Sequence, residues 1–320
     1  MPVVEDALFD EPNDFKAHDP SSTRESDEGG AVERVALWFE GHADLENRFS
    51  SALRQALDEV LDGQRTGRYD VDALEKTEKT YLGTKVEIIC RTAFDLGFGN
   101  KMDYRVCGHE VDAKFSLDGR WMIPREAMGH ICLLMAANDR RSSFKVGLVR
   151  VSEDVLTQGG NQDGKRNISS SGKRMIRWII EEGKLKPNLL LGLDPTVREA
   201  LSREPAGQNR VDLLFGMVHR RIIDRNAVLT VAKQLDAAKR VRDARKRLAP
   251  DGVVILGHQK ESPRVAKALG LEVPEKGTWI ATRLIPAPID DGRPQVWIDG
   301  VSYVEARSDE KPQPAPAVDC

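Results

Sequence analysis

The stretch that decides the fold is residues 103–114, Asp-Tyr-Arg-Val-Cys-Gly-His-Glu-Val-Asp-Ala-Lys. Two short segments with alternating apolar residues, 102–106 and 111–115, flank a polar Cys-Gly-His-Glu turn. This pattern is typical of a β-hairpin. Asp112 and Lys114 are one residue apart, so on a strand both side chains project from the same face. Asp103 can join them from the facing strand. We therefore expect two carboxylates and one ammonium group to converge on one point.

This set of side chains suits the hydrolysis of a phosphodiester. Carboxylate oxygens hold Mg²⁺, which stabilises charge on the phosphate and lowers the pKa of a bound water. A lysine beside them places positive charge next to the attacking water. An Asp-x-Lys pattern also occurs in solvated hairpins, however, so the motif alone leaves both interpretations open.

The composition is that of an ordinary globular protein. The chain has 320 residues, of which 40% are hydrophobic and 31% charged, and this length predicts two domains. No apolar run approaches the roughly twenty residues of a membrane span, and the N-terminus does not resemble a signal peptide, so we expect a cytoplasmic protein without a membrane partner. The four cysteines lack the spacing of a zinc site or a disulfide framework.

The net charge of −3 conceals an asymmetry along the chain. Residues 1–30 contain nine acidic and two basic residues, which predicts a disordered acidic tail. Residues 233–247 contain seven basic and two acidic residues. Such a basic segment can bind phosphates whatever the total charge, although a solvated basic helix face would have the same composition.

The first part of the chain predicts a mixed sheet flanked by helices, an α/β (α+β) fold. Apolar residues at helical spacing predict helices over residues 30–60 and 71–94, and Glu87 lies in the second. Beyond the hairpin, a buried strand is expected over residues 130–136 and another strand over residues 145–151.

The second part of the chain predicts a winged helix-turn-helix. Helices are expected over residues 211–223, 227–234 and 237–248, and strands over residues 252–257 and 278–284. Two helices joined by a tight turn, the later one basic, and then a hairpin are typical of that motif, whereas a plain helical bundle is the alternative.

A short helix over residues 175–180 is expected to close the first domain, before a segment in which charge, Gly and Pro cluster. The predicted organisation is a disordered tail over residues 1–30, an α/β domain over 31–180, a linker over 181–187, a winged-helix domain over 188–306 and a disordered tail over 307–320.

Segments on both sides of the linker match one protein family in order along the chain. In the first part they are residues 62–68 (DGQRTGR), 76–80 (KTEKT), 83–88 (GTKVEI), 111–116 (VDAKFS), 129–133 (GHICL) and 147–151 (GLVRV). In the second part they are residues 183–185 (GKL), 188–191 (NLLL), 239–242 (KRVR), 255–259 (ILGHQ) and 269–274 (LGLEVP). From about residue 53 to about residue 286 the chain thus resembles the NaeI-like type II restriction endonucleases.

The resemblance implies a restriction-endonuclease-like N-terminal domain and a C-terminal CAP-like winged helix-turn-helix. It also implies a type IIE homodimer that binds two copies of double-stranded DNA, cutting one and using the other as effector. The family's usual target is the GC-rich palindrome GCCGGC, cut to blunt ends, with a cognate DNA methyltransferase as functional companion. By matching position, the family's catalytic residues fall on Glu87, Asp103, Asp112 and Lys114. The first three of these are the implied Mg²⁺ ligands.

Basic residues in both parts are candidates for DNA contact. Arg65 and Arg68 can contact phosphates just ahead of the helix that carries Glu87, or can be surface charge. For the effector duplex, the candidates in the basic helix are Lys239, Arg240, Arg242, Arg245 and Lys246. Lys260 and Arg264 are candidates for the wing.

Two other functions remain as alternatives. One is a winged-helix regulator that binds DNA without cutting it, and the other is a repair nuclease with little sequence preference. A complete set of three acids and one lysine disfavours the regulator, because binding alone does not need a metal site.

Overall fold

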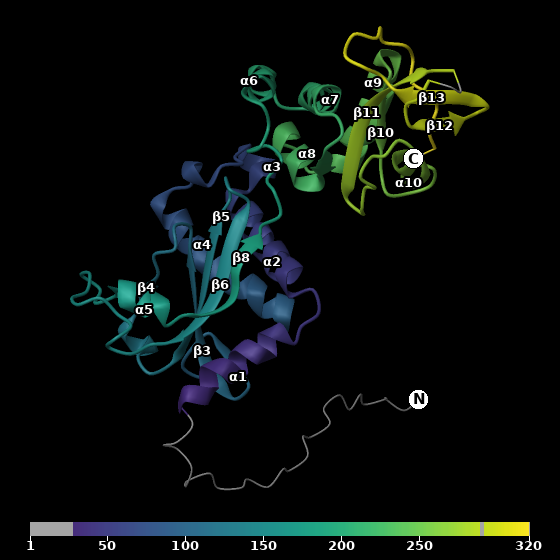
Figure 1. Cartoon of the computed structure of the whole chain (residues 1–320). Coiled ribbons are helices and arrows are strands. Elements are labelled where there is room, and N and C mark those ends of the chain that lie inside the picture. The colour runs from purple at the N-terminus through teal and green to yellow at the C-terminus, as the bar shows by residue number, and fades with distance from the viewer. Residues whose placement is uncertain (1–27, 289–290, 320) are drawn as a thin grey trace, which may run out of the picture.

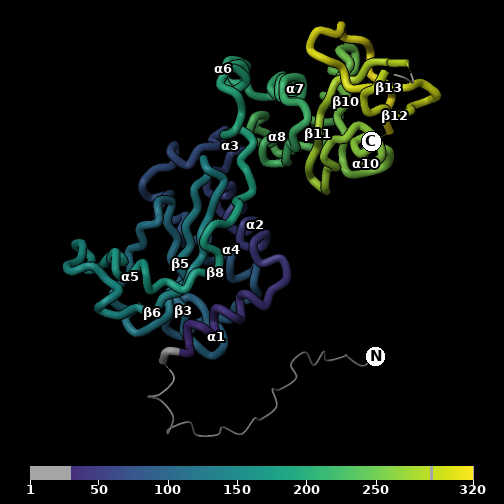
Figure 2. Tube along the Cα trace, viewed as in Figure 1, coloured from purple at the N-terminus to yellow at the C-terminus, as the bar shows by residue number. Residues whose placement is uncertain are grey.

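The computed structural model describes residues 28–288 and 291–319, and the greater part of the acidic tail predicted over residues 1–30 lies outside the described residues. The chain has a mixed α/β architecture: a six-stranded mixed sheet flanked by helices, followed by a smaller antiparallel sheet. Figures 1 and 2 show these parts as two lobes that meet near α3 and α8. No helix in residues 28–288 or 291–319 has both the length and the apolar character needed to cross a membrane.

The first lobe is built from five helices and eight strands. The helices are α1 (Glu28–Glu40), α2 (Leu45–Leu61), α3 (Gly63–Thr66), α4 (Lys76–Phe94) and α5 (Ser170–Arg174). The main sheet has the order β1-β2-β3-β5-β6-β8 and contains β1 (Gly97–Phe98), β2 (Tyr104–Val106), β3 (His109–Ser116), β5 (Ile131–Asn138), β6 (Ser143–Arg150) and β8 (Arg177–Lys184). Two further strands, β4 (Met122–Ile123) and β7 (Arg166–Asn167), pair with each other.

The predicted hairpin is confirmed as β2 and β3, which pair antiparallel, but His109 and Glu110, which were expected in the turn, belong to β3. The two residues of its turn, Cys107 and Gly108, have φ values of 49° and 80°. Positive φ at both positions is the backbone that a two-residue hairpin turn with the native strand twist requires. The strand β3 then runs parallel to β5, which is the predicted buried strand, and β5 pairs antiparallel with β6. The hairpin that carries the candidate site is therefore fixed to the centre of the sheet.

The helices differ from the prediction at their ends. The single helical region expected over residues 30–60 is two helices, because the chain turns at residues 41–44, where Asp44 has a φ of 58°. The next helix, expected from residue 71, begins at Lys76. The side chain of Glu78 accepts a hydrogen bond from the backbone N–H of Glu75 at 2.8 Å, which completes a capping box. This capping box fixes the start of α4.

The helix predicted over residues 175–180 is wrong. Residues Arg177–Lys184 form β8, an edge strand that pairs with β6. Trp178 and the two following isoleucines favour a strand, and β6 offers them an unpaired backbone edge. As a result, the first four residues of the segment expected as a linker belong to the sheet. Leu185, just after the strand, is buried in the core of the first lobe.

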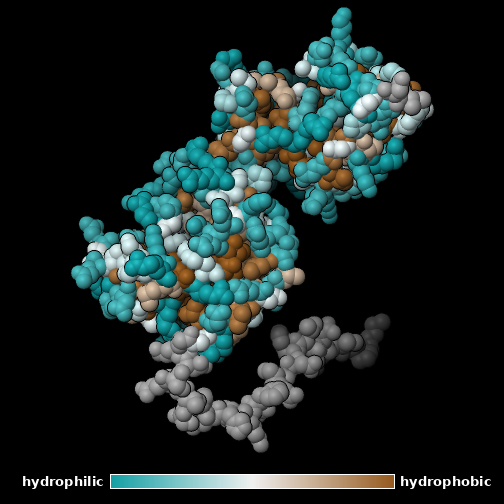
Figure 3. Space-filling view, in the orientation of Figure 1, coloured by the Kyte–Doolittle hydropathy of each residue, from teal (hydrophilic) through white to brown (hydrophobic). Residues whose placement is uncertain are grey.

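The sheet of the first lobe is covered on both faces. On one face α1, α2 and α4 enclose an apolar core in which the rings of Phe39, Phe49 and Phe94 contact one another. On the other face, Trp121 and its neighbours form a second cluster beneath the short β4 and β7 strands. The face drawn in Figure 3 is mostly hydrophilic, with hydrophobic residues visible between hydrophilic ones on both lobes.

The second lobe contains five helices and five strands. The helices are α6 (Pro195–Arg203), α7 (Gln208–Met217), α8 (Arg225–Ala232), α9 (Ala237–Leu248) and α10 (Ser262–Ala268). The strands are β9 (Ile222–Asp224), β10 (Val253–Leu256), β11 (Thr278–Pro286), β12 (Gln295–Ile298) and β13 (Val301–Glu305). They form a sheet of order β10-β11-β13-β12, and β9 also pairs with β11.

The elements predicted for this lobe are partly confirmed. Helices α8 and α9 and strands β10 and β11 lie where the sequence predicted them. The helix expected over residues 211–223 ends at Met217 and is followed by β9, while α10, β12 and β13 were not predicted. Residues 307–319 were expected to be disordered, yet Ala315 and Val318 pack against the apolar cluster around α10. Burial of these two apolar side chains, together with the hydrogen bond from Ala315 N to Ala249 O at 2.8 Å, holds the segment in place.

The two lobes contact each other through α2, α3 and α8. Gly63 lies so close to α8 that a Cβ atom would be 2.2 Å from Oγ1 of Thr230, so the approach requires glycine. Asn226 Nδ2 on α8 donates a hydrogen bond to Asp58 Oδ2 on α2 at 2.8 Å. Asp58 also accepts a hydrogen bond from Arg54, which donates to the buried Asp139 at the turn between β5 and β6. A continuous polar network thus runs from α8 to the main sheet.

Candidate active site

Three acidic residues and one lysine gather where α4 faces the β2–β3 hairpin. Asp112 and Lys114 project from the same face of β3, and Lys114 Nζ lies 2.7 Å from Asp112 Oδ1. Asp103, just before β2, accepts a hydrogen bond from Ala113 N through Oδ2 at 2.7 Å. Glu87 reaches the site from α4, close enough for the charges of Asp103 and Lys114 to act on it. The four residues selected in the sequence therefore lie together.

The site is partly buried, and its acids influence one another. Burial raises the pKa of Glu87, and the neighbouring charge of Asp103 raises it further, against the effect of Arg91. Burial also raises the pKa of Asp112, against the attraction of Lys114. Because nearby acids disfavour each other's ionised forms, a cation placed between them would relieve the repulsion.

The donor atoms fit a hard divalent cation, although the side chains are not yet arranged around one point. In the part of the chain that the structure describes, no group of three His, Cys, Asp or Glu side chains is positioned as a metal site. Lys114 contacts both carboxylate oxygens of Asp112, and Arg91 holds Oε1 of Glu87 at 2.7 Å. Carboxylate oxygens are the ligands that Mg²⁺ prefers, so Glu87, Asp103 and Asp112 are the residues that could hold it.

Arg91 supports the site and was not identified from the sequence. Its Nη2 donates hydrogen bonds to Glu87 Oε1 at 2.7 Å and to the Asp103 carbonyl at 3.1 Å. Its guanidinium carbon lies 4.3 Å from the centroid of the Phe98 ring. The spacing of four residues between Glu87 and Arg91 on a helix was the available signal, because it places both side chains on one face.

Glu110 shapes the loop that leads into the site. Its carboxylate accepts hydrogen bonds from three consecutive backbone N–H groups, at Asn100, Lys101 and Met102, over 2.9–3.0 Å. These bonds lower its pKa to about 2. Asp103 follows Met102 directly in the chain, so these hydrogen bonds also fix the backbone position of Asp103. The sequence contained no signal for this role, because the partners are backbone groups distant along the chain.

The candidate DNA-contacting residues of the first lobe differ in how they are held. Arg65 is exposed and pairs with Asp62 at 3.0 Å. Arg68 instead forms two hydrogen bonds with Glu78, at 2.9 and 2.8 Å, and this contact lowers the pKa of Glu78 to about 2. Arg68 therefore stabilises the start of α4, and Arg65 has the more available charge.

The candidates in the basic helix α9 fall into two groups. Lys239, Arg242 and Lys246 are exposed. Arg240 faces α7, where it contacts Gln208, and Arg245 donates a hydrogen bond to the Ile255 carbonyl at 2.8 Å. Lys239, Arg242 and Lys246 therefore have charge that is more accessible to a DNA phosphate than that of Arg240 and Arg245.

The two candidates for the wing are held by nearby groups. Lys260 pairs with Asp319 at 2.5 Å. Arg264 pairs with Glu261 at 2.7 Å and also approaches the Trp297 carbonyl. A duplex would have to replace these surface contacts, which are individually weak.

Three acids and a lysine that gather between α4 and the β2–β3 hairpin of a helix-flanked mixed sheet are typical of a class of protein, the nucleases that cleave phosphodiesters. A sequence model described as "Restriction endonuclease NaeI" matches residues 34–314. The chain is 42% identical over 283 residues to the type II restriction enzyme NaeI of Lentzea aerocolonigenes, an alignment that covers 85% of this chain and 89% of that protein. The chain belongs to the NaeI family of restriction endonucleases. It is therefore a type II restriction enzyme, a DNA-binding deoxyribonuclease.

Proposed function

We propose that this enzyme cleaves double-stranded DNA at a specific GC-rich palindrome, GCCGGC, to give blunt ends, with Mg²⁺ as its cofactor. The observation that carries the proposal is the gathering of Glu87, Asp103, Asp112 and Lys114 at the hairpin. Membership of a restriction endonuclease family supports it, and the target sequence follows the family's usual one.

The chain supplies both the ligands and the positive charge that hydrolysis needs. Glu87, Asp103 and Asp112 would hold Mg²⁺, which when bound stabilises charge on the scissile phosphate and acidifies water. Lys114 stabilises negative charge on the phosphate oxygens and orients the attacking water through its ammonium group. Water adds to phosphorus and the P–O3′ bond breaks, which leaves a 3′-hydroxyl and a 5′-phosphate.

For the C-terminal part we propose a CAP-like winged helix-turn-helix that binds an effector duplex. Helices α8 and α9 would be the two helices of the motif, and β10 with β11 the wing. The exposed cations Lys239, Arg242 and Lys246 on α9 would contact phosphates or base edges, and Lys260 and Arg264 the backbone beside the wing. The first lobe would be an endonuclease domain of a restriction-endonuclease-like fold, and the second lobe the effector domain. The linker between them would begin after β8. The enzyme would act as a homodimer in the cytoplasm beside a cognate DNA methyltransferase.

Substitution of the site tests the nuclease assignment. We expect Asp112→Ala and Lys114→Ala each to lower cleavage of plasmid DNA by at least about a hundredfold while binding to DNA is largely kept. Asp118→Ala is the matched control, because Asp118 lies just after β3 and pairs with Arg120 at the surface. Full cleavage by either variant would overturn the assignment.

Plasmid digestion with Mg²⁺ also separates the enzyme from the alternatives. Discrete fragments support site-specific cleavage, whereas a smear would indicate a nuclease with little sequence preference. A gel shift without cleavage would indicate a DNA-binding regulator. Sequencing the fragment ends then gives the target and the cut position, and ends outside GCCGGC would refute the proposed target.

A further inference from the structure

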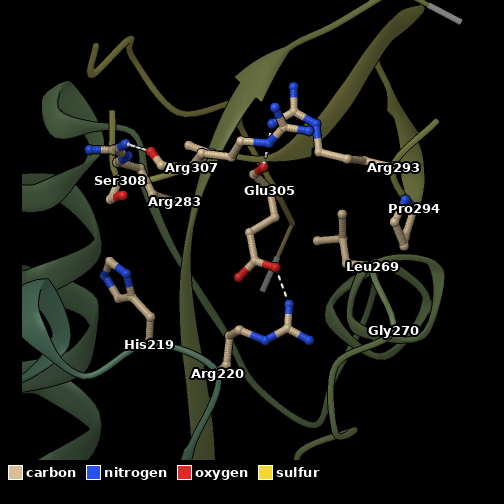
Figure 4. A pocket seen from close by; sticks show the side chains of 11 residues that line it. His219, Arg220, Leu269, Gly270, Arg283, Arg293, Pro294, Glu305, Arg307 and Ser308 are labelled. Carbon is tan, nitrogen blue, oxygen red and sulfur yellow. Dashed lines mark hydrogen bonds and ion pairs between the residues drawn. The ribbon is translucent and has the colours of Figure 1, made fainter. Parts of the chain in front are cut away.

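A cavity of about 640 Å³ opens in the second lobe, and its lining includes no residue of the acidic site or of α9. It arises because β9 and β13 both pair with the same edge of β11, at opposite ends of that strand. Between them, Ala281 O accepts a hydrogen bond from Arg220 N, and Arg283 O accepts one from Ala306 N. Arg220 and Arg283, which lie at these two hydrogen-bonded positions, both line the cavity (Figure 4).

The walls of the cavity combine positive charge with apolar surface. Leu269 and Gly270, at the end of α10, and Pro294 line one side. Glu305 is the single acid of the lining. Four arginines line the remainder: Arg220, Arg283, Arg293 and Arg307. A volume of this size lies in the range of small-molecule sites.

Two of these arginines are neutralised by carboxylates. Arg220 pairs with Glu305, whose other oxygen accepts a hydrogen bond from Thr282 Oγ1 at 2.6 Å. Arg293 pairs with Asp291 and with Glu310, the latter at 2.8 Å. These pairs fix two guanidinium groups in the wall of the cavity.

The other two arginines have no carboxylate partner within ion-pair distance among residues 28–288 and 291–319. Arg283 donates through Nη2 to the carbonyls of Arg307 and Glu310. The side chain of Arg307 is exposed at the rim. His219 also lines the cavity. Burial lowers the pKa of His219 most, and the positive charge of Arg283 lowers it further. An anion would complement this charge.

We propose that this cavity binds a free nucleoside phosphate. Arg283 and Arg307 bind the phosphate, since a guanidinium fork matches two phosphate oxygens, and the side of Leu269 and Pro294 accepts the base or sugar. An apolar side beside the arginines suits a ligand whose base or sugar is free to enter the cavity. The exposed cations of α9 do not line it, so the site is separate from the proposed effector surface.

Calorimetric titration of the full chain with AMP, ATP and inorganic pyrophosphate tests the proposal. We expect AMP or ATP to bind at one site, more tightly than pyrophosphate, and Arg307→Glu to weaken that binding about tenfold or more. Arg242→Glu is the matched control, because Arg242 is exposed on α9, and it should leave nucleotide binding unchanged. Arg307→Gln, with thermal unfolding of both variants, separates loss of binding from loss of folding.

Several results would overturn the proposal. One is the absence of binding heat when the unsubstituted protein is titrated with millimolar nucleotide. A second is nucleotide binding by Arg307→Glu and Arg307→Gln that is as tight as that of the unsubstituted protein. A third is pyrophosphate binding as tight as that of the nucleotides. Loss of nucleotide binding in Arg242→Glu, with competition by duplex DNA, would assign the phosphates to the DNA-binding surface instead. None of these outcomes depends on cleavage activity.

Discussion

At the scale of single residues, the candidate acids are held by neighbouring groups outside the set of four. Glu87 and Asp103 come from different elements, and the guanidinium group of Arg91 joins them by donating to the carboxylate of one and the carbonyl of the other. The hydroxyl of Tyr104 adds a hydrogen bond to the Glu87 carbonyl at 2.8 Å. Partners of metal-binding carboxylates fix the orientation in which those carboxylates meet an ion. We therefore regard Arg91 as a positioning residue.

We expect Arg91→Ala to weaken metal binding and to lower the cleavage rate by about tenfold to a hundredfold, because Glu87 is then no longer oriented by a guanidinium group. Calorimetric titration with Ca²⁺ measures the metal affinity separately from catalysis. Arg91→Lys should recover part of both. Lys79→Ala, at an exposed position on the same helix, is the control. Unchanged Ca²⁺ affinity in Arg91→Ala would remove Arg91 from the site.

At the scale of elements, the loop before β2 is held from β3. Three backbone N–H groups donate to Glu110, which precedes Asp112 by two residues on the same strand. The hairpin that provides Asp112 and Lys114 thus also fixes the loop that provides Asp103. The acids from these two segments are therefore held beside each other by backbone hydrogen bonds.

The stability added by Glu110 should depend on pH. Its pKa is about 2 in the folded protein, against an ordinary value of 4.5. A lowered folded pKa means that the stabilisation is complete above about pH 4.5 and is lost as the pH falls toward 2. We expect the unfolding temperature of Glu110→Gln to lie below that of the unsubstituted protein at pH 7, and the gap to narrow as the pH falls below 4.5. A gap that stays constant down to pH 3 would contradict this role.

At the scale of the whole molecule, the two lobes are joined by polar contacts as well as by the chain. The network from Asn226 through Asp58 and Arg54 ends at Asp139 beside the main sheet. The Arg54–Asp139 pair in this network is buried, and removing one partner of a buried pair leaves an uncompensated charge. A movement of α8 on binding DNA would therefore change the contacts of α2, which covers the sheet.

Removal of the exposed charge on α9 tests whether the second lobe acts on the first. We expect replacement of Lys239, Arg242 and Lys246 by glutamine to weaken binding of a second duplex and to slow cleavage of one-site plasmids. The slope of log affinity against log salt concentration should shrink by about 0.9 for each phosphate that the variant no longer neutralises. Unchanged dependence on a second site would refute the effector role.

The control replaces three other exposed cations of the second lobe by glutamine, and so removes the same total charge: Arg203, Lys267 and Lys276. These residues lie outside α9, so the control should keep both the salt slope and the cleavage of one-site plasmids. Equal reductions in both variants would indicate a general effect of charge.

The sequence by itself determined the elements whose local pattern is strong. Alternating apolar residues on either side of the polar segment 107–110 determined the hairpin, and regular apolar spacing determined α8 and α9. Asp112 and Lys114 were placed on one face by the two-residue period of a strand. Glu87 and the family came from the resemblance between whole segments, since a glutamate on a helix has no distinguishing local pattern.

Only the tertiary structure decided the features that depend on contacts distant along the chain. The segment at residues 177–184 became a strand because β6 offered it an edge, and Ala315 was ordered because the second lobe buries it. The role of Glu110 rests on backbone partners that no local pattern encodes, and that of Arg91 depends in part on the Asp103 carbonyl, which lies outside α4. The arginine-lined cavity exists because two strands share one edge of β11. Local spacing fixes which side chains share a face, whereas packing decides which faces meet.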